Sequence, residues 1–97
     1  MGVQRDGAFC EYISMPVERI YEGKGLSAEE LALIEPFSIS QHAVSRCTIK
    51  ETDNVLIIGA GPIGLFAFLA AKAKCKNVVV ADILDNRLDL ADRKSVV

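Results

Sequence analysis

The sequence lacks the residues that mark several common classes of protein. It has no tryptophan, three prolines and one histidine, and its three cysteines include no C-x-x-C pair. A zinc knuckle or a disulfide framework is therefore not expected. Its 11 Lys and Arg against 13 Asp and Glu give a net charge of -2. This balance gives no sign of nucleic acid or an anionic membrane surface as a partner.

Signals for export or membrane insertion are also scarce. Arg5 and Asp6 stand where a secretory signal peptide would have its apolar core, so we expect a cytoplasmic protein. The uncharged stretch 54–71 is interrupted by glycines and a proline, which favours two elements of a globular fold over a membrane span. What remains is an ordinary globular composition, 51% hydrophobic and 25% charged, in 97 residues.

The first part of the chain predicts strands followed by a helix. Residues 7–21 mix aromatic and branched side chains around Pro16, which predicts two short strands with a kink at the proline. Ser27 stands three residues before Glu30, and this spacing is typical of a capping box. We therefore expect a helix over residues 28–34.

Pro36 divides the segment that follows. Because proline lacks the N–H of an intrahelical bond, we expect the first helix to end there and a second one to run over Ser38–Cys47. One side of this second helix is expected to be buried. That side comprises Ile39, Ala43, Val44 and Cys47.

The second half of the chain has the order strand, helix, strand, helix. Strands are predicted at Asn54–Ile58 and Asn77–Ala81, because short apolar runs between turn residues are typical of strands buried on both faces of a parallel sheet. Helices are predicted over Pro62–Lys74, apolar on nearly all sides, and over Asp85–Lys94, which is more polar. This order predicts a right-handed parallel crossover in an α/β fold.

A G-x-G-x-x-G motif, Gly59-Ala60-Gly61-Pro62-Ile63-Gly64, joins the first predicted strand to the helix after it. Gly59 would permit a tight turn, Gly61 would let a pyrophosphate approach the backbone, and Gly64 would let the helix pack closely on the strand. Pro62 suits the first helical turn, and the N–H groups near Ile63 and Gly64 can bind phosphate oxygens. The alternative is a tight turn that binds nothing.

An acidic residue completes the pattern of a dinucleotide site. Asp82 ends the second predicted strand 23 positions after Gly59, near the spacing of about 20 that such sites have. Asp82 would accept hydrogen bonds from the adenosine ribose and repel a 2′-phosphate, which favours NAD over NADP. Asp82 could instead be a solvated strand-end acid or a helix cap. Arg87 could lie against the adenine, reach a phosphate, or be a solvated helix residue.

Three segments together resemble one known family over nearly the whole chain. They are residues 2–12 with Asp-Gly-Ala-Phe-Cys-Glu-Tyr, residues 32–39 with Glu-Pro-Phe-Ser, and residues 55–64 with the glycine motif. These segments are similar to the zinc-containing medium-chain alcohol dehydrogenases. The Glu-Pro-Phe-Ser form is most similar to the polyol and sugar-acid branch, which includes sorbitol, threonine and hexonate dehydrogenases.

The resemblance implies a domain organisation and a reaction. Residues 1–35 would be the end of a GroES-like catalytic domain, with its C-terminal strands and helices, and residues 36–97 the first part of an NAD-binding Rossmann domain. The expected reaction is NAD(H)-linked oxidation of a secondary alcohol of a polyol or sugar acid at a catalytic zinc. The expected assembly is a homo-oligomer that binds a small-molecule substrate.

The resemblance also assigns residues. Glu35 matches the glutamate that borders the catalytic zinc, directly or through the metal-bound water, although a helix-terminal acid is the alternative. Ile39 falls where the family has a side chain against the nicotinamide ring, and a core isoleucine is equally compatible with the sequence. The matches to the family's dinucleotide-binding positions are Gly59, Gly61, Pro62, Ile63, Gly64, Asp82 and Arg87.

The chain also departs from the family. The family's first catalytic cysteine, its Gly-His-Glu zinc segment and its four-cysteine loop have no counterpart here. With one of four zinc-site groups, the chain is expected to be a fragment of a dehydrogenase that is inactive alone. Two other classes stay open: a non-catalytic nucleotide-binding or assembly module whose sheet edges pair between copies, and a site for another adenosine ligand such as S-adenosylmethionine.

Overall fold

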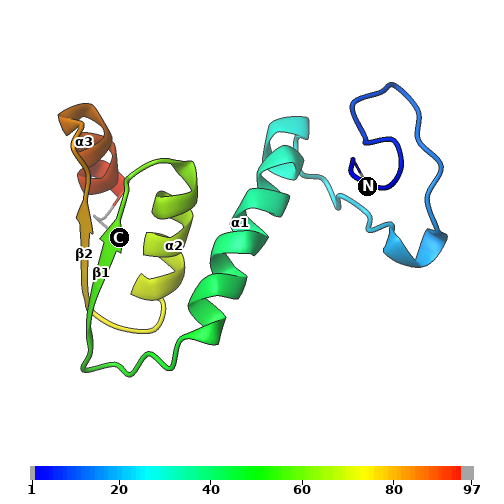
Figure 1. The fold of residues 1–97 in the computed structure, drawn as a ribbon. Coiled ribbons are helices and arrows are strands. Elements are labelled where there is room, and N and C mark those ends of the chain that lie inside the picture. The colour runs from blue at the N-terminus through cyan, green and yellow to red at the C-terminus, as the bar shows by residue number, and fades with distance from the viewer. Residues whose placement is uncertain (1, 95–97) are drawn as a thin grey trace.

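The computed structural model describes residues 2–94 and forms an α/β fold (Figure 1). Two strands, β1 (Asn54–Ile58) and β2 (Asn77–Ala81), pair in parallel, with Asn54 opposite Asn77 and Ile58 opposite Ala81. The predicted strand bounds and the parallel pairing are confirmed. The other elements are a 3₁₀ helix η1 (Val17–Arg19) and the helices α1 (Ala28–Arg46), α2 (Pro62–Lys72) and α3 (Asp85–Lys94).

Helix α2 lies between the sheet and α1 (Figure 1). The buried core of this part joins Val44 of α1 to Ala70 and Ala71 of α2. Half-buried apolar side chains pack around it, namely Ile49, Val55, Ile57, Ala67 and Val78. Because α2 has a neighbour on two opposite sides, its apolar residues need not form a single stripe. This arrangement explains why the sequence of α2 is apolar on nearly all sides.

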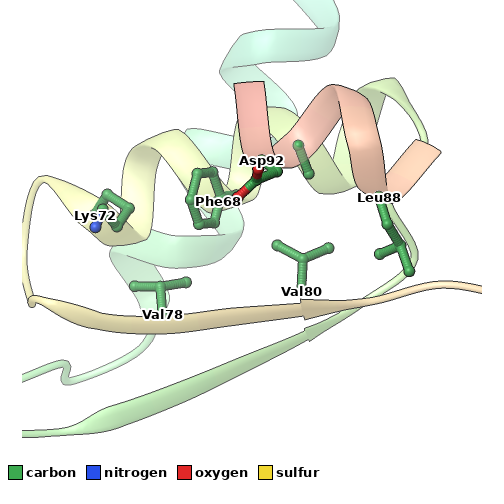
Figure 2. Close-up of a pocket in the computed structure, with 7 residues that line it drawn as sticks. Phe68, Lys72, Val78, Val80, Leu88 and Asp92 are labelled. Carbon is green, nitrogen blue, oxygen red and sulfur yellow. The ribbon is translucent and has the colours of Figure 1, made fainter. Parts of the chain in front are cut away.

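Helix α3 covers the same face of the sheet as α2. Figure 2 shows Val78 and Val80 rising from β2 toward Phe68 of α2 and Leu88 of α3. Between these elements lies an open pocket of about 440 Å³. Its lining consists of Phe68, Lys72, Val78, Val80, Leu88, Ala91 and Asp92.

The opposite face of the sheet is uncovered in the part of the chain that the structure describes. Exposed fractions are 61% for Leu56, 85% for Ile58 and 62% for Val79. The two strands therefore alternate between exposed and half-buried residues. The prediction that both faces are buried is wrong for residues 2–94, because α2 and α3 lie on one side only.

Helix α1 begins as predicted. The Ser27 backbone N–H donates to Glu30 Oε2 at 2.8 Å, and the Glu30 N–H donates to Ser27 Oγ at 3.2 Å. Both halves of a capping box are thus formed, and they satisfy two N–H groups that the first turn of a helix leaves without partners.

The predicted break at Pro36 is wrong, because α1 continues through it as one helix of 19 residues. A proline removes one N–H from the helical ladder, but packing can hold the turns on either side. Such packing follows at once: the rings of Phe37 and Phe66 of α2 meet edge to face, with centroids 5.4 Å apart. The boundary proposed between residues 35 and 36 falls inside this helix and stays a prediction.

The buried side of α1 also differs from the prediction. Val44 is buried as expected, but its buried companion is Ser40, at 1% exposure. Ile39 is 54% exposed, and Ala43 and Cys47 are exposed as well. Ser40 and Val44 are four residues apart and share one face of the helix, whereas Ile39 and Ala43 belong to the adjacent row.

Residues 2–27 form an irregular segment that lies apart from the helices and strands (Figure 1). Its only regular element is η1, so the two strands predicted within 7–21 are wrong. A strand needs a second backbone to pair with, and none of the described residues supplies one. The radius of gyration is 16.3 Å, against about 13 Å for a compact domain of this size. None of the described helices is long and apolar enough to cross a membrane.

Candidate functional site

The glycine motif forms a tight turn from β1 into α2. Gly59 has a φ of +102°, a conformation that favours glycine, and its N–H donates to the Ala81 carbonyl oxygen at 2.7 Å. The Leu65 N–H donates to the Gly61 carbonyl oxygen at 2.9 Å, which starts the helical ladder. The N–H groups of Ile63 and Gly64 therefore lie ahead of that ladder, at the positive end of the α2 dipole.

The other two glycines of the motif meet different requirements. A Cβ atom at Gly64 would overlap the carbonyl oxygen of Gly59 and would lie 3.8 Å from Cγ2 of Ile57. A Cβ atom at Gly61 would meet no atom within 4 Å. Gly64 is thus needed for the turn to close on itself, whereas Gly61 borders open space where a ligand can approach the backbone.

Asp82 follows β2 and reaches across to this turn. Its Oδ2 accepts the Ala60 N–H at 2.7 Å, and its Oδ1 accepts the Leu84 N–H at 2.9 Å. The Asp82 side chain is only 5% exposed. Both carboxylate oxygens therefore hold backbone groups, one in the glycine turn and one at the approach to α3. The bond to the Leu84 N–H is an Asx turn before α3 and not a helix cap, because Leu84 precedes the helix and its carbonyl oxygen accepts the first helical bonds.

These contacts favour the ionised form of Asp82. The Ala60 N–H, followed by the Leu84 N–H, holds the pKa of the Asp82 carboxyl below its ordinary value. Partial burial acts in the opposite direction and is outweighed, while the Arg87 guanidinium adds a smaller lowering. The site thus carries a fixed negative charge beside the turn.

Arg87 pairs with this carboxylate. Its Nη1 lies 3.6 Å from Asp82 Oδ2, and half of the Arg87 side chain is exposed. At that distance and exposure the ion pair contributes little to stability. The pair nevertheless holds the guanidinium at the edge of the turn.

Glu35 and Ile39 lie on α1, outside the turn, and both are exposed. The Glu35 carbonyl oxygen accepts the Ser38 hydroxyl at 2.7 Å. Among residues 2–94, no three His, Cys, Asp or Glu side chains come together in a way that could hold a metal ion. The described residues by themselves therefore do not fit a catalytic zinc, which needs about three protein ligands.

Ser40 is a residue of the site region that the sequence analysis missed. Its hydroxyl lies 2.9 Å from the Ile63 carbonyl oxygen, in the first turn of α2, and 3.4 Å from the Pro36 carbonyl oxygen. It thereby ties α1 to the start of the helix that follows the glycine turn. The signal was available: Ser40 stands four residues before Val44, so a buried Val44 predicts a buried serine that needs an acceptor.

The pocket of Figure 2 is separate from the turn. It opens between α2, α3 and β2, and none of its lining residues belongs to the glycine motif. Its floor is apolar, and its charged residues are Lys72 and Asp92. The candidate site therefore consists of the turn and Asp82.

Curated relatives cover most of the chain. It is 52% identical over 82 residues to L-galactonate-5-dehydrogenase of Escherichia coli K12, a match that covers 84% of this chain and 24% of that protein. It is 41% identical over 90 residues to sorbitol dehydrogenase of Bacillus subtilis, covering 91% of the chain and 26% of the relative. For L-threonine 3-dehydrogenase of Streptomyces coelicolor the identity is 39% over 93 residues, covering 94% and 27%.

The chain thus spans about a quarter of the length of the curated relatives that it matches. No model of a protein family matches it. All three relatives are dehydrogenases by name, acting on a sugar acid, a polyol or an amino acid with a hydroxyl group.

Proposed function

Because the chain belongs to the zinc-containing medium-chain alcohol dehydrogenases, in the polyol and sugar-acid branch, we propose that the protein in which it occurs is an NAD(H)-linked dehydrogenase. Its substrate is a secondary alcohol of a polyol or sugar acid. The observation that carries this proposal is the Asp82 carboxylate, 2.7 Å from the Ala60 nitrogen inside the turn. Strand, glycine turn, helix and strand-end acid together favour a dinucleotide as the ligand.

The turn has the features that a pyrophosphate requires. The N–H groups of Ile63 and Gly64 precede the helical ladder of α2, and such groups bind phosphate oxygens at helix N-termini. Gly61 borders open space, so a phosphate can approach the backbone without meeting a side chain. Pro62 occupies the first helical position, where it gives up no hydrogen bond.

Asp82 selects the cofactor in this proposal. Each of its oxygens already accepts one backbone N–H. Oδ2 also faces Nη1 of Arg87 at 3.6 Å, so the second lone pair of Oδ1 is the one left for a ribose hydroxyl. A 2′-phosphate would meet the fixed carboxylate charge, so NAD is favoured over NADP. Arg87 lies beside Asp82, at the adenosine end of the proposed site. When bound, NAD would take the hydride from the carbinol carbon, and the hydroxyl proton would be released, as the secondary alcohol becomes a ketone.

The remaining parts of the proposal concern residues of α1 and the whole protein. Ile39 is an exposed residue of α1 that we assign to the nicotinamide side, and Glu35 we assign to the border of a zinc site. Because the described residues do not fit a zinc site alone, further ligands must come from beyond them. We accordingly propose that the 97-residue chain by itself is inactive. We also propose that the whole protein is a homo-oligomer in the cytoplasm.

The test is an activity assay on the full-length protein that carries this sequence. NADH formation is measured by absorbance with L-galactonate, sorbitol and L-threonine, before and after removal of metal by a chelator. We expect turnover with a sugar acid or polyol, loss of turnover after chelation, and recovery with zinc. The isolated chain serves as the control and is expected to give none.

Ligand titrations separate the alternatives. NAD and S-adenosylmethionine are titrated into the same full-length protein by calorimetry. Binding of NAD alone supports the dehydrogenase. Binding of S-adenosylmethionine alone would overturn it in favour of another adenosine site. Binding of NAD with no turnover on any alcohol would favour a non-catalytic nucleotide-binding module.

A further inference from the structure

The carboxylate of Asp82 joins two backbone segments before any ligand is present. Through Oδ2 it holds the Ala60 N–H at 2.7 Å, and through Oδ1 the Leu84 N–H at 2.9 Å. The bond to Ala60 is part-buried, whereas the bond to Leu84 is exposed. Hydrogen bonds to an ionised acceptor are roughly twice as strong as neutral ones. Asp82 therefore acts on the turn in the free protein.

The residue that Asp82 holds lies in the most adaptable part of the turn. Ala60 stands between Gly59, with its φ of +102°, and Gly61, the residue that precedes α2. Glycine loses more conformational freedom on ordering than any other residue. Ala60 is buried, at 1% exposure, so its methyl group is packed against the protein. One packed methyl group and one hydrogen bond thus fix the residue between the two glycines.

We propose that Asp82 is a positioning residue for the glycine turn, which it holds through the Ala60 N–H so that the N–H groups at the start of α2 are aligned for a pyrophosphate. This inference rests on the proposed function for the identity of the ligand. Asp82 then has two roles. It contacts the ribose directly, and through the turn it affects the binding of the pyrophosphate, which it does not touch.

The two roles predict opposite signs for a ligand without ribose. Inorganic pyrophosphate lacks the sugar, so a carboxylate that serves only ribose gives it nothing. Loss of the Asp82 charge would then leave pyrophosphate affinity unchanged or raise it, because two negative charges repel. If Asp82 positions the turn, the same loss weakens pyrophosphate binding, since the N–H groups are no longer aligned beforehand.

The first experiment needs no ligand. Amide hydrogen exchange is followed at Ala60 in the full-length protein and in the Asp82→Ala and Asp85→Ala variants. Asp85 is an exposed carboxylate at the start of α3, so Asp85→Ala removes the same charge nearby. We expect exchange at Ala60 to be at least about tenfold faster in Asp82→Ala, as for loss of a charge-assisted bond, and unchanged in Asp85→Ala. Unchanged exchange in a folded Asp82→Ala protein overturns the proposal.

The second experiment measures inorganic pyrophosphate binding by calorimetry for the same three proteins. Asp82→Ala is expected to weaken binding several-fold, while Asp85→Ala leaves it equal or slightly tighter. Equal or tighter binding to Asp82→Ala overturns the positioning role. If Asp82→Ala does not fold, Asp82→Asn takes its place, because it keeps the volume and loses the charge. Faster exchange at Ala60 then supports the proposal, and unchanged exchange contradicts it.

Failure of the positioning role and failure of the proposed function give different experimental results. If the unaltered protein binds no NAD, the dinucleotide assignment fails, yet the exchange result at Ala60 still decides whether Asp82 holds the turn. If NAD binds and the exchange rates of Ala60 are equal in the unaltered and Asp82→Ala proteins, the positioning role fails while the dinucleotide site stands.

Discussion

Residues 54–94 are richer in apolar residues than residues 2–27, and the two segments reach very different states. The first segment is irregular, and its aromatic residues are almost fully exposed, as in Phe9, Tyr12 and Tyr21. The second forms two strands and two helices with a common buried face. The β-α-β-α unit contains its own packing partners, because each strand is followed in the sequence by a helix that covers one face of the sheet. Residues 7–21 have strand-forming residues but no second strand to pair with.

The largest difference in stability is expected when one glycine from each region is replaced by alanine. In Gly64→Ala the new Cβ overlaps the Gly59 carbonyl oxygen, so the turn must open. We expect the free energy of unfolding to fall by about 4 kcal/mol or more. In Gly7→Ala the Cβ lies 3.5 Å from the Gly2 Cα, an ordinary contact, so the expected change is within about 0.5 kcal/mol. Urea denaturation measures both, and equal effects would remove the contrast.

The second largest effect on stability is expected for a buried phenylalanine, compared with an exposed one. Phe68 is 5% exposed and packs between α2, α3 and β2, whereas Phe9 projects from the irregular segment. Phe68→Ala is expected to cost about 3 kcal/mol, at the lower end for a buried phenylalanine because the adjoining pocket is open. Phe9→Ala is expected to change stability by less than about 0.5 kcal/mol. Thermal denaturation of both variants measures these changes. A large loss of stability for Phe9→Ala would contradict the exposed position of Phe9 in residues 2–27.

A smaller effect is expected where α1 meets the β-α-β-α unit. Ser40→Ala removes the buried bond to the Ile63 carbonyl oxygen and should cost about 1 kcal/mol. Ser38→Ala removes an exposed hydroxyl bonded at 2.7 Å to the Glu35 carbonyl oxygen, and it serves as the matched control. Its expected cost is within about 0.5 kcal/mol. Equal losses of stability in the two variants would mean that burial does not matter at this joint.

The last effect is a pH dependence at the turn. The backbone bonds from Ala60 and Leu84 lower the pKa of Asp82 in the folded protein, while the unfolded chain titrates near about 3.9. The stabilisation from Asp82 is therefore complete above the unfolded pKa and is lost as the pH falls through the folded one. Unfolding is compared in urea for the protein and its Asp82→Asn variant. We expect their stability difference to shrink below about pH 4, and a constant difference would contradict this assignment.

The sequence predicted the β-α-β-α unit well, for physical reasons that are local. The strands at Asn54–Ile58 and Asn77–Ala81 have the predicted bounds, because glycine, lysine and asparagine delimit short apolar runs. Ser27 and Glu30 form the predicted capping box within one turn of helix. Helix α2 ends at Lys72, two residues earlier than predicted. Each of these features depends on residues that are neighbours in the sequence.

Features that depend on distant contacts were not predictable in this way. The continuity of α1 through Pro36 is accompanied by packing of Phe37 on Phe66, 29 positions further along the chain. The bond from Ala60 to Asp82 crosses from one strand end to the other, and no periodicity encodes it. Likewise, Lys74 Nζ donates to the Val44 carbonyl oxygen at 3.2 Å, from the turn after α2 to the last part of α1.

The candidate site shows the same division. The motif Gly59–Gly64 and the acid at Asp82 follow from spacing alone, and the structure brings them within hydrogen-bond distance. Glu35 and Ile39 came from a family resemblance, and both side chains are exposed on α1. Their assignment to metal and nicotinamide stays a prediction.

We propose above all that the turn and Asp82 bind NAD. The most direct measurement is calorimetric titration of the full-length protein with NAD and with NADP. The account predicts that NAD binds at least about tenfold more tightly, because the 2′-phosphate meets the fixed charge of Asp82. It also predicts that Asp82→Asn narrows this difference. Equal affinity for the two cofactors, or no binding of either, would contradict the account.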